Sequence, residues 1–223
     1  MEFRHEWKHE ISVFDLFSLR QRLRAVAQPD PHASDGAYRI RSLYFDNSAD
    51  KALREKLDGI NFREKFRIRY YNGDPTLLHL EKKSKVGSLC NKQSAPLRLE
   101  EAQAVVEGEL SWMAGCDRPL IQELYCKMTQ QGLRPKTIVD YIREPFIYGP
   151  GNVRITLDSQ IRTGMFCRDF LNPSCITVPA GNVPAILEVK WDAFLPSVIR
   201  DVVQLEGCRT TSFSKYAACR IYG

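Results

Sequence analysis

The feature that most constrains this chain is an alternation of charged and apolar residues that recurs in one segment after another. Residues 65–71 are the clearest case: every second side chain up to Arg69 is basic, and the residues between them are Phe66, Ile68 and Tyr70. Successive side chains of a β-strand point to opposite faces of a sheet. The segment therefore predicts a strand with one cationic face and one apolar face.

The same alternation extends over most of the chain, and the polar positions are ionic rather than rich in Ser and Thr. It recurs in residues 2–11, 79–85, 139–143, 153–158 and 186–192. A single strand of this kind ordinarily turns its polar side to water. The repetition favours another arrangement, because the predicted helices need an apolar sheet face to pack on. In it, the apolar faces lie outward beneath the helices and the ionic faces point inward.

Local patterns predict a mixture of short strands and helices. The predicted strands are residues 2–11, 38–46, 64–72, 76–84, 136–144, 152–158, 160–168 and 184–192. The predicted helices are residues 14–27, 49–57, 99–107, 117–131, 196–204 and 212–221. Asp117 is the expected N-cap of its helix, Gly132 its stop, and Ser212 or Ser214 caps the last helix. Because strands often follow one another, the predicted class is α+β, a mainly antiparallel closed β-barrel with a charged interior surrounded by helices.

Composition excludes several classes of protein. The chain has 223 residues, of which 43% are hydrophobic, so it can form a core, and no linker divides the predicted single domain 1–223. Its seven cysteines contain no CxxC pair, which argues against a disulfide framework or a structural zinc site. No apolar run approaches the ~20 residues of a membrane span, and the first residues lack the apolar core of a signal peptide. We expect a cytoplasmic protein without direct membrane insertion.

A hollow lined by so many cations predicts a polyanionic ligand. The net charge is only +5, from 32 basic and 27 acidic residues, so placement matters more than the total. Like charges in a partly desolvated cavity repel one another unless an anion joins them. Phosphate chains suit the planar fork of Arg and the point charge of Lys, and interspersed carboxylates would hold a divalent metal between phosphate oxygens. A nucleic-acid partner is not predicted, because the aromatic residues fall mainly on the apolar faces.

Several ordered motifs carry a resemblance to a known family. They are Arg4-His5-Glu6-Trp7-Lys8, Ser42-Leu43-Tyr44-Phe45-Asp46, Phe66-Arg67-Ile68-Arg69-Tyr70-Tyr71, Leu80-Glu81-Lys82-Lys83, Tyr141-Ile142-Arg143, Val153-Arg154-Ile155-Thr156-Leu157-Asp158, Ile186-Leu187-Glu188-Val189-Lys190 and Phe213-Ser214-Lys215-Tyr216. Together they resemble the triphosphate tunnel metalloenzyme (CYTH-like) superfamily, and within it the VTC domain, a polyphosphate polymerase module. The resemblance spans nearly the whole chain.

The first motif departs from a related branch of that superfamily. The adenylate cyclase and thiamine-triphosphatase type opens with a Glu-x-Glu-x-Lys strand, whereas the equivalent positions here are Arg4, Glu6 and Lys8. One metal-binding carboxylate is thus replaced by a cation. This departure counts against simple triphosphate hydrolysis. It fits the resemblance to the VTC branch, whose tunnel is richer in basic residues.

The resemblance implies a metal-dependent polyphosphate polymerase, which transfers the γ-phosphate of ATP to a growing polyphosphate chain. By resemblance, the residues that grip the nucleotide and chain phosphates at the catalytic centre are Lys8, Arg67, Arg69, Lys83, Arg154 and Lys215. Substrate binding is extended by Arg4, Arg143 and Lys190. The implied metal is Mn²⁺ or Mg²⁺, with Glu188 as the first ligand and Glu6 and Glu81 as further candidates. The implied partners are ATP and polyphosphate, and no membrane or protein partner is identified.

Alternative interpretations remain open at this level. The same fold could hydrolyse triphosphate or short polyphosphate, or it could be a non-catalytic sensor of polyphosphate or an inositol phosphate. Glu188 could merely pair with an Arg on a neighbouring strand, and Arg143 could have a structural role. Lys8 and Lys215 could be solvated, and Tyr44-Phe45 is more typical of a core than of a nucleotide-stacking site.

Overall fold

The computed structural model describes residues 4–87, 89–164, 166–205 and 211–220, and the predicted α+β class is confirmed. The strands are β1 (His5–Ile11), β2 (Gln28–Pro29), β3 (Tyr38–Asp46), β4 (Phe62–Tyr71), β5 (Asp74–Val86), β6 (Leu89–Leu97), β7 (Arg134–Tyr148), β8 (Val153–Gly164), β9 (Thr177–Pro179) and β10 (Ala185–Trp191). The α-helices are α1 (Val13–Val26), α2 (Lys51–Leu57), α3 (Leu99–Glu107), α4 (Ser111–Ala114), α5 (Pro119–Gln130), α6 (Ser197–Val203) and α7 (Lys215–Cys219). No helix within the described ranges has the length and apolar character needed to cross a membrane.

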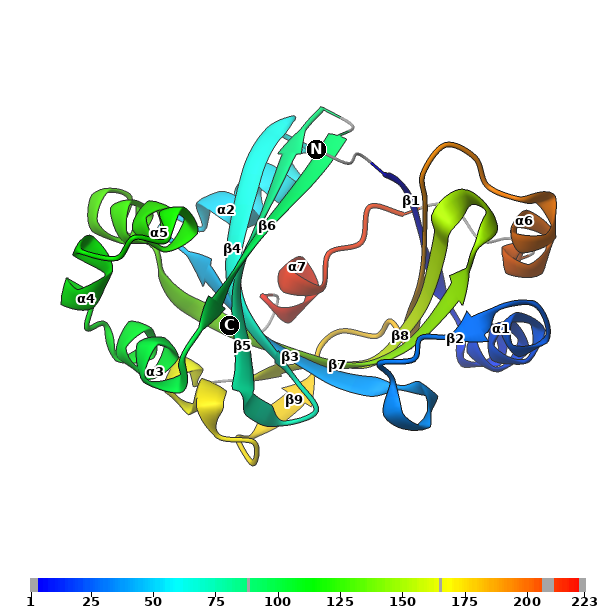
Figure 1. Ribbon diagram of the computed structural model, residues 1–223, viewed down its shortest axis with the longest axis horizontal. Coiled ribbons are helices and arrows are strands. Elements are labelled where there is room, and N and C mark those ends of the chain that lie inside the picture. The colour runs from blue at the N-terminus through cyan, green and yellow to red at the C-terminus, as the bar shows by residue number, and fades with distance from the viewer. Residues whose placement is uncertain (1–3, 88, 165, 206–210, 221–223) are drawn as a thin grey trace.

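All ten described strands belong to one antiparallel sheet. Its main path runs β1-β10-β8-β7-β3-β4-β5-β6, with β2 paired to β7 and β9 paired to β8. The sheet is strongly curved, and α7 lies on its concave side, which is called the hollow below (Figure 1). The predicted closed barrel is wrong in one respect: among the described strands, no ladder joins β1 to β6, so the sheet is open.

The edge strand β6 helps to explain why the sheet stays open. It carries Lys92 and Pro96, two residue types that discourage further pairing at a strand edge. The curved sheet has two arms, one formed by β3–β6 and the other by β7, β8, β10 and β1. Side chains rather than backbone hydrogen bonds connect the ends of these arms: Nζ of Lys83 on β5 lies 3.4 Å from Oε2 of Glu6 on β1. The Lys83–Glu6 ion pair therefore spans the gap between the two edges, and an anionic ligand could contact Lys83 there.

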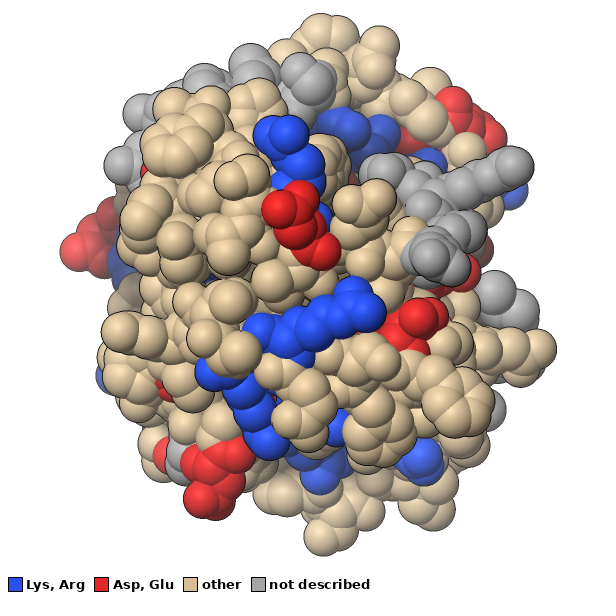
Figure 2. All heavy atoms as spheres, turned by 90° about the vertical axis from the view of Figure 1, so that its right-hand side faces the viewer, with Lys and Arg blue, Asp and Glu red and all other residues tan. Residues whose placement is uncertain are grey.

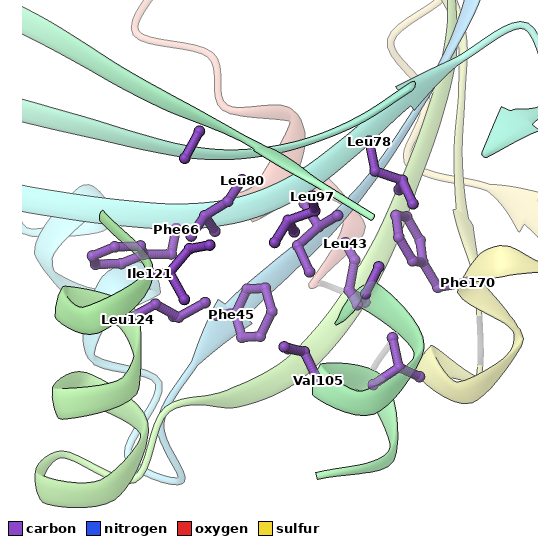
Figure 3. Close-up of a cluster of buried hydrophobic side chains, with 14 of the residues drawn as sticks. Leu43, Phe45, Phe66, Leu78, Leu80, Leu97, Val105, Ile121, Leu124 and Phe170 are labelled. Carbon is purple, nitrogen blue, oxygen red and sulfur yellow. The ribbon is translucent and has the colours of Figure 1, made fainter. Parts of the chain in front are cut away.

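The outer face of the sheet is apolar and covered by helices, as predicted. On one arm, side chains of β3–β6 such as Phe66 and Leu80 pack against Val105 of α3 and Ile121 of α5 (Figure 3). On the other arm, β8 and β10 pack beneath α1 and α6 (Figure 1). Burial of apolar surface on the outside leaves the opposite side chains of each strand for the hollow.

The hollow is not uniformly ionic, which the sequence did not predict. A third apolar cluster forms on the inner face around α7, and it includes Tyr44, Tyr141 and Tyr216. Tyr216 donates a hydrogen bond of 2.6 Å to the Asp46 carboxylate, and its ring stacks on Tyr44. This cluster anchors α7 inside the curved sheet.

Most predicted elements are present with shifted bounds. The two strands predicted at 152–158 and 160–168 form the single strand β8, within which Gln160 adopts a positive φ of 52°. Strand β6 was missed because its sequence lacks alternation. The N-cap of α5 is Arg118 rather than Asp117, whereas Ser214 caps α7 through the backbone N–H of Ala217. Residues 2, 3, 165 and 221 of the predicted elements lie outside the described residues.

Candidate functional site

Strands β4 and β5 bring two arginines and one glutamate together on the inner face. Arg67 lies directly opposite Glu81 in the ladder, and its Nη2 is 2.6 Å from the carboxylate. Its Nη1 also donates to the Tyr44 hydroxyl at 2.8 Å. Arg69 donates to the Ser42 hydroxyl at 3.0 Å and lies 3.6 Å from the same carboxylate. Glu81 therefore serves two guanidinium groups and is 3% exposed.

The opposite edge of the hollow carries a second ionic group, made by β1 and β10. The ladder places Glu6 opposite Lys190 and Lys8 opposite Glu188. Lys8 contacts Glu6 and lies 3.5 Å from Glu188, while Lys190 lies 2.5 Å from Glu188. Lys83 of β5 contacts Glu6 of this group. The β1–β10 group therefore lies across the gap from the β4–β5 group that contains Arg67.

These charges determine one another's ionisation. Burial alone would raise the pKa of Glu188, but Lys190 and Lys8 outweigh it and hold that pKa well below its usual range. Burial likewise opposes the charge on Lys8, yet Glu188 and Glu6 raise its pKa. Burial, together with repulsion from Lys8, lowers the pKa of Lys83. The β1–β10 group thus contains two lysines and two glutamates whose charges balance. Lys83 adds one further positive charge that this group does not neutralise.

A third group lies where α7 meets the inner face. Asp158 is fully buried, and its carboxylate forms ion pairs with Nε of Arg143 and Nζ of Lys215, each at 2.6 Å. The Tyr141 ring lies beneath both cations, 4.8 Å from Nζ of Lys215. The two cations outweigh the effect of burial and lower the pKa of Asp158. Lys215 therefore projects from the start of α7 into the hollow.

The structure does not bring every predicted residue into these groups. Arg154 pairs with Asp30 at 3.2 Å and donates to the Tyr38 hydroxyl at 2.9 Å. Arg4 pairs with Asp192 at 2.7 Å at the end of β1. The ladders place Arg154 in the same row as Lys190 and Glu6, although its ion pair is with Asp30, and Arg4 lies just before β1. The roles of both arginines in substrate binding remain predictions.

Three of the alternative interpretations can be compared with these contacts. Among the described residues, Glu188 forms ion pairs with two lysines and with no arginine, and the side chains of Lys8 and Lys215 are only 21% and 12% exposed. Phe45 packs in the outer core, as expected, but Tyr44 points inward and binds Arg67. The motif Tyr44-Phe45 is therefore split between the two faces.

Two residues that were not singled out as site residues lie among the cations. Nζ of Lys65 is 5.9 Å from the centre of the Tyr44 ring, and burial lowers the pKa of Lys65 to about 8. Burial would raise the pKa of Tyr44, but Arg67 and Lys65 dominate and lower it to about 8. The alternation over 65–71 already placed Lys65 on the cationic face, so the signal was present in the sequence.

The carboxylates fit a metal that is shared with a phosphate ligand. Within the described part of the chain, no three His, Cys, Asp or Glu side chains form a group that could hold an ion. Glu6 and Glu188 nevertheless both contact Lys8 and repel each other electrostatically, so they are neighbours. Mg²⁺ is commonly bound by one or two carboxylates together with substrate phosphates. Glu81 suits this less well, because Arg67, Arg69 and Lys92 already face it.

A curved antiparallel sheet with cations and carboxylates on its inner face, and helices on its outer face, defines a triphosphate-tunnel type of fold. A family model described as the VTC domain matches residues 3–221, so the chain belongs to the VTC domain family. This membership supports a phosphoryl-related function. A search of curated proteins found no match.

Comparison with solved structures found similar chains that include the following three, of which the first supports the same fold. A putative adenylate cyclase from Bacillus halodurans is 14% identical, with a TM-score of 0.53, and the match covers 85% of this chain and 80% of that one. A protein from Pyrococcus horikoshii is 12% identical, with a TM-score of 0.44 and 90% and 84% coverage. A putative adenylate cyclase from Vibrio parahaemolyticus is 12% identical, with a TM-score of 0.47 and 90% and 82% coverage.

Proposed function

We propose that this protein transfers the γ-phosphate of ATP to the end of a growing polyphosphate chain and releases ADP. The observation that carries the proposal is the charge on the inner face of β4 and β5. There Arg67, Arg69 and Lys92 share one carboxylate, Glu81, and the next row of the ladder adds Lys65 and Lys83, of which Lys83 contacts Glu6 of β1. Such an excess of cations is unfavourable unless a polyanion neutralises it.

The reaction needs positioning and charge neutralisation rather than covalent catalysis. A terminal oxygen of the acceptor chain attacks the γ-phosphorus, and the bond between that phosphorus and the oxygen bridging to the β-phosphate breaks. ADP leaves with the bridging oxygen. The attacking oxygen is already an anion, so no general base is required. Arg67, Arg69 and Lys83 would hold the two anionic chains against their mutual repulsion, with Lys8 and Lys215 approaching from the opposite side.

Glu188 and Glu6 are the residues proposed to hold Mn²⁺ or Mg²⁺. A divalent ion bound there supplies charge neutralisation on phosphate oxygens. The lowered pKa values of Glu188 and Glu6 keep both carboxylates ionised at neutral pH, which is the form that binds a metal. Lys8 and Lys190 compensate these carboxylates in the free protein and can turn toward phosphate when an ion replaces them.

The remaining predictions belong to the same proposal. Arg143 and Lys190 would extend the grip on the chain, with further contacts from Arg154, which lies beside Lys190 in the ladder, and from Arg4. The whole chain, 1–223, would act as one domain whose partners are ATP and polyphosphate rather than nucleic acid. A location in the cytoplasm is the expected setting.

The direct test is incubation of the purified chain with ATP and either Mn²⁺ or Mg²⁺. Polyphosphate chains that lengthen with time, in step with ADP, are the expected product. Release of free phosphate without chain growth would instead identify a hydrolase. Tight polyphosphate binding with no turnover at any metal concentration would identify a sensor. Chain growth that is unchanged in both Arg67→Ala and Lys83→Ala would overturn the placement of the site.

A further inference from the structure

The cations on the inner face of β4, β5 and β6 are arranged in rows that continue beyond the Arg67–Glu81 pair. In the next row toward the β5–β6 turn, the ladder sets Lys65, Lys83 and Lys92 side by side on three adjacent strands. In the row after that, Arg63 lies opposite Lys85. Like charges directly opposite each other destabilise a sheet. Two consecutive rows of this kind therefore lower the free energy of unfolding unless an anion binds to them.

The outer row lacks acidic partners among the described residues. Arg63 donates to the carbonyl of Ile60, and Lys85 has no ion pair with a described carboxylate. Lys56 of α2 adds a further cation. Burial lowers the pKa of Lys56, and repulsion from the nearby Arg63, Lys8 and Lys85 lowers it further. Lys56 donates to the Ser212 hydroxyl and forms no ion pair with a described carboxylate. The nearest described carboxylates have other partners: Glu6 contacts Lys83 in the row before, Glu81 lies in the Arg67 row, and Glu64 of β4 pairs with Lys82 and Lys127 on the opposite face.

The arrangement has a direction. On the other side of the Arg67 row, Arg69 lies opposite His79, and His79 lies opposite Pro96, so the density of cations falls. Toward the β5–β6 turn it rises. Rows on one face of a strand are two residues apart, or ~7 Å. Arg63 and Lys85 therefore lie ~13 Å from the Arg67 row along the strand direction, too far to hold the same phosphate group.

We infer that Lys56, Arg63 and Lys85 form a binding path for the distal part of a phosphate chain, which leaves the central site past Lys65 and along β4 and β5 toward the β5–β6 turn. This inference rests on the proposed function for its ligand and adds residues that the central site does not require. Short anions would occupy the Arg67 and Lys83 rows alone. Only a longer polyphosphate would reach the outer row, so these residues would confer a preference for long chains.

The test compares the affinity of the full chain for tripolyphosphate and for long-chain polyphosphate at fixed ionic strength. The variants are Arg63→Glu and Lys85→Glu, each paired with the milder Arg63→Gln or Lys85→Gln. The matched control is Arg24→Glu, which makes the same charge change at an exposed position on the outer helix α1. We expect ~10-fold weaker binding of the long chain in the Glu variants, since each removes charge-assisted contacts. Tripolyphosphate binding and the control should change by less than about twofold.

Each other outcome would overturn the path. Unchanged binding of the long chain in the Glu variants would mean that the outer row is merely solvated. Equal weakening for both ligands, or equal weakening in the Arg24 control, would indicate a general charge effect. If a Glu variant fails to bind tripolyphosphate because it does not fold, its Gln variant decides by the same comparison.

The result is independent of catalysis. Because binding is measured without ATP, a length preference that is lost in the variants would support the path even if the chain makes no polyphosphate. Conversely, chain growth from ATP together with unchanged long-chain binding in the variants would leave the proposed function standing and remove the path.

Discussion

The two arms of the sheet carry their charges in opposite ways. On the arm formed by β7, β8, β10 and β1, the inner cations near α7 and β1 have close carboxylates: Arg143 and Lys215 share Asp158, and Lys190 pairs with Glu188. On the arm formed by β4, β5 and β6, Glu81 serves several cations, and Arg63 and Lys85 have no described acidic partner. The inner charges of the first arm are balanced without a ligand, whereas the second arm has the excess of positive charge on which the proposed function rests.

The outer surface shows neither pattern. On the side over α1 and α6, basic and acidic residues are scattered among uncharged ones (Figure 2). This face therefore has no one-sided arrangement of charge like that of the β4–β6 arm, and the difference between the arms can be tested by substitution.

The largest effect is expected where a carboxylate of the balanced arm is removed. Asp158→Asn leaves Arg143 and Lys215 without their shared partner in a buried position, and breaking such a group costs about 3 kcal/mol of the free energy of unfolding. Urea denaturation measures this loss, and added tripolyphosphate should restore part of it. Asp192→Asn is the control, because its pair with Arg4 is more exposed and is worth less than about 1 kcal/mol. Equal stability of the two variants would contradict the contrast.

Removing a cation from the other arm should affect activity rather than stability. Arg67→Ala leaves Glu81 with Arg69 and Lys92, so we expect an unchanged or slightly higher unfolding midpoint. Chain growth from ATP should fall ~100-fold, as when one preorganised donor is lost from a transition-state site. A time course on gels and a thermal melt measure the two effects. Arg24→Ala, on the outer face of α1, should change neither.

Glu188→Gln tests the metal assignment. The variant removes one negative charge while keeping the shape, and we expect the metal concentration that gives half-maximal activity to rise ~10-fold. Glu81→Gln is the comparison, because Glu81 already faces three cations and should shift that concentration less. A metal titration identical to that of the unmodified protein would reassign the ligand to another carboxylate.

The smallest effect is a pH dependence of anion binding. The groups around Lys65 are Tyr44 on β3, Arg67 on its own strand, Lys83 on β5 and Lys8 on β1. With pKa values of about 8 for Lys65 and Tyr44, the site loses a positive charge and gains a negative one as the pH rises through 8. Tripolyphosphate binding should therefore weaken several-fold between about pH 7 and 9, with a midpoint above 8 because the bound anion favours protonated Lys65.

The variant Lys65→Arg separates this titration from others. Because Arg stays protonated, its profile between the same pH values should be flatter than that of the unmodified protein. Calorimetric titration at fixed ionic strength measures both curves. Superimposable profiles would show that Lys65 does not titrate in this range.

The sequence by itself determined which side chains share a face. In residues 65–71 the alternation separates Phe66, which is buried beneath α5, from Arg67, which faces the hollow. The same pattern assigned Glu81 and Lys83 of β5 to the inner face. This could be predicted because the period of two is a property of the extended backbone and needs no knowledge of the neighbouring strands.

Only the tertiary structure decided how those faces meet. It left the β1 and β6 edges apart, placed α7 with Tyr216 in the hollow, and paired Arg154 with Asp30. It also added β6, whose sequence has no clear alternation. These outcomes depend on contacts between residues far apart in the chain, and local periodicity carries no information about which strands become neighbours or where a sheet ends.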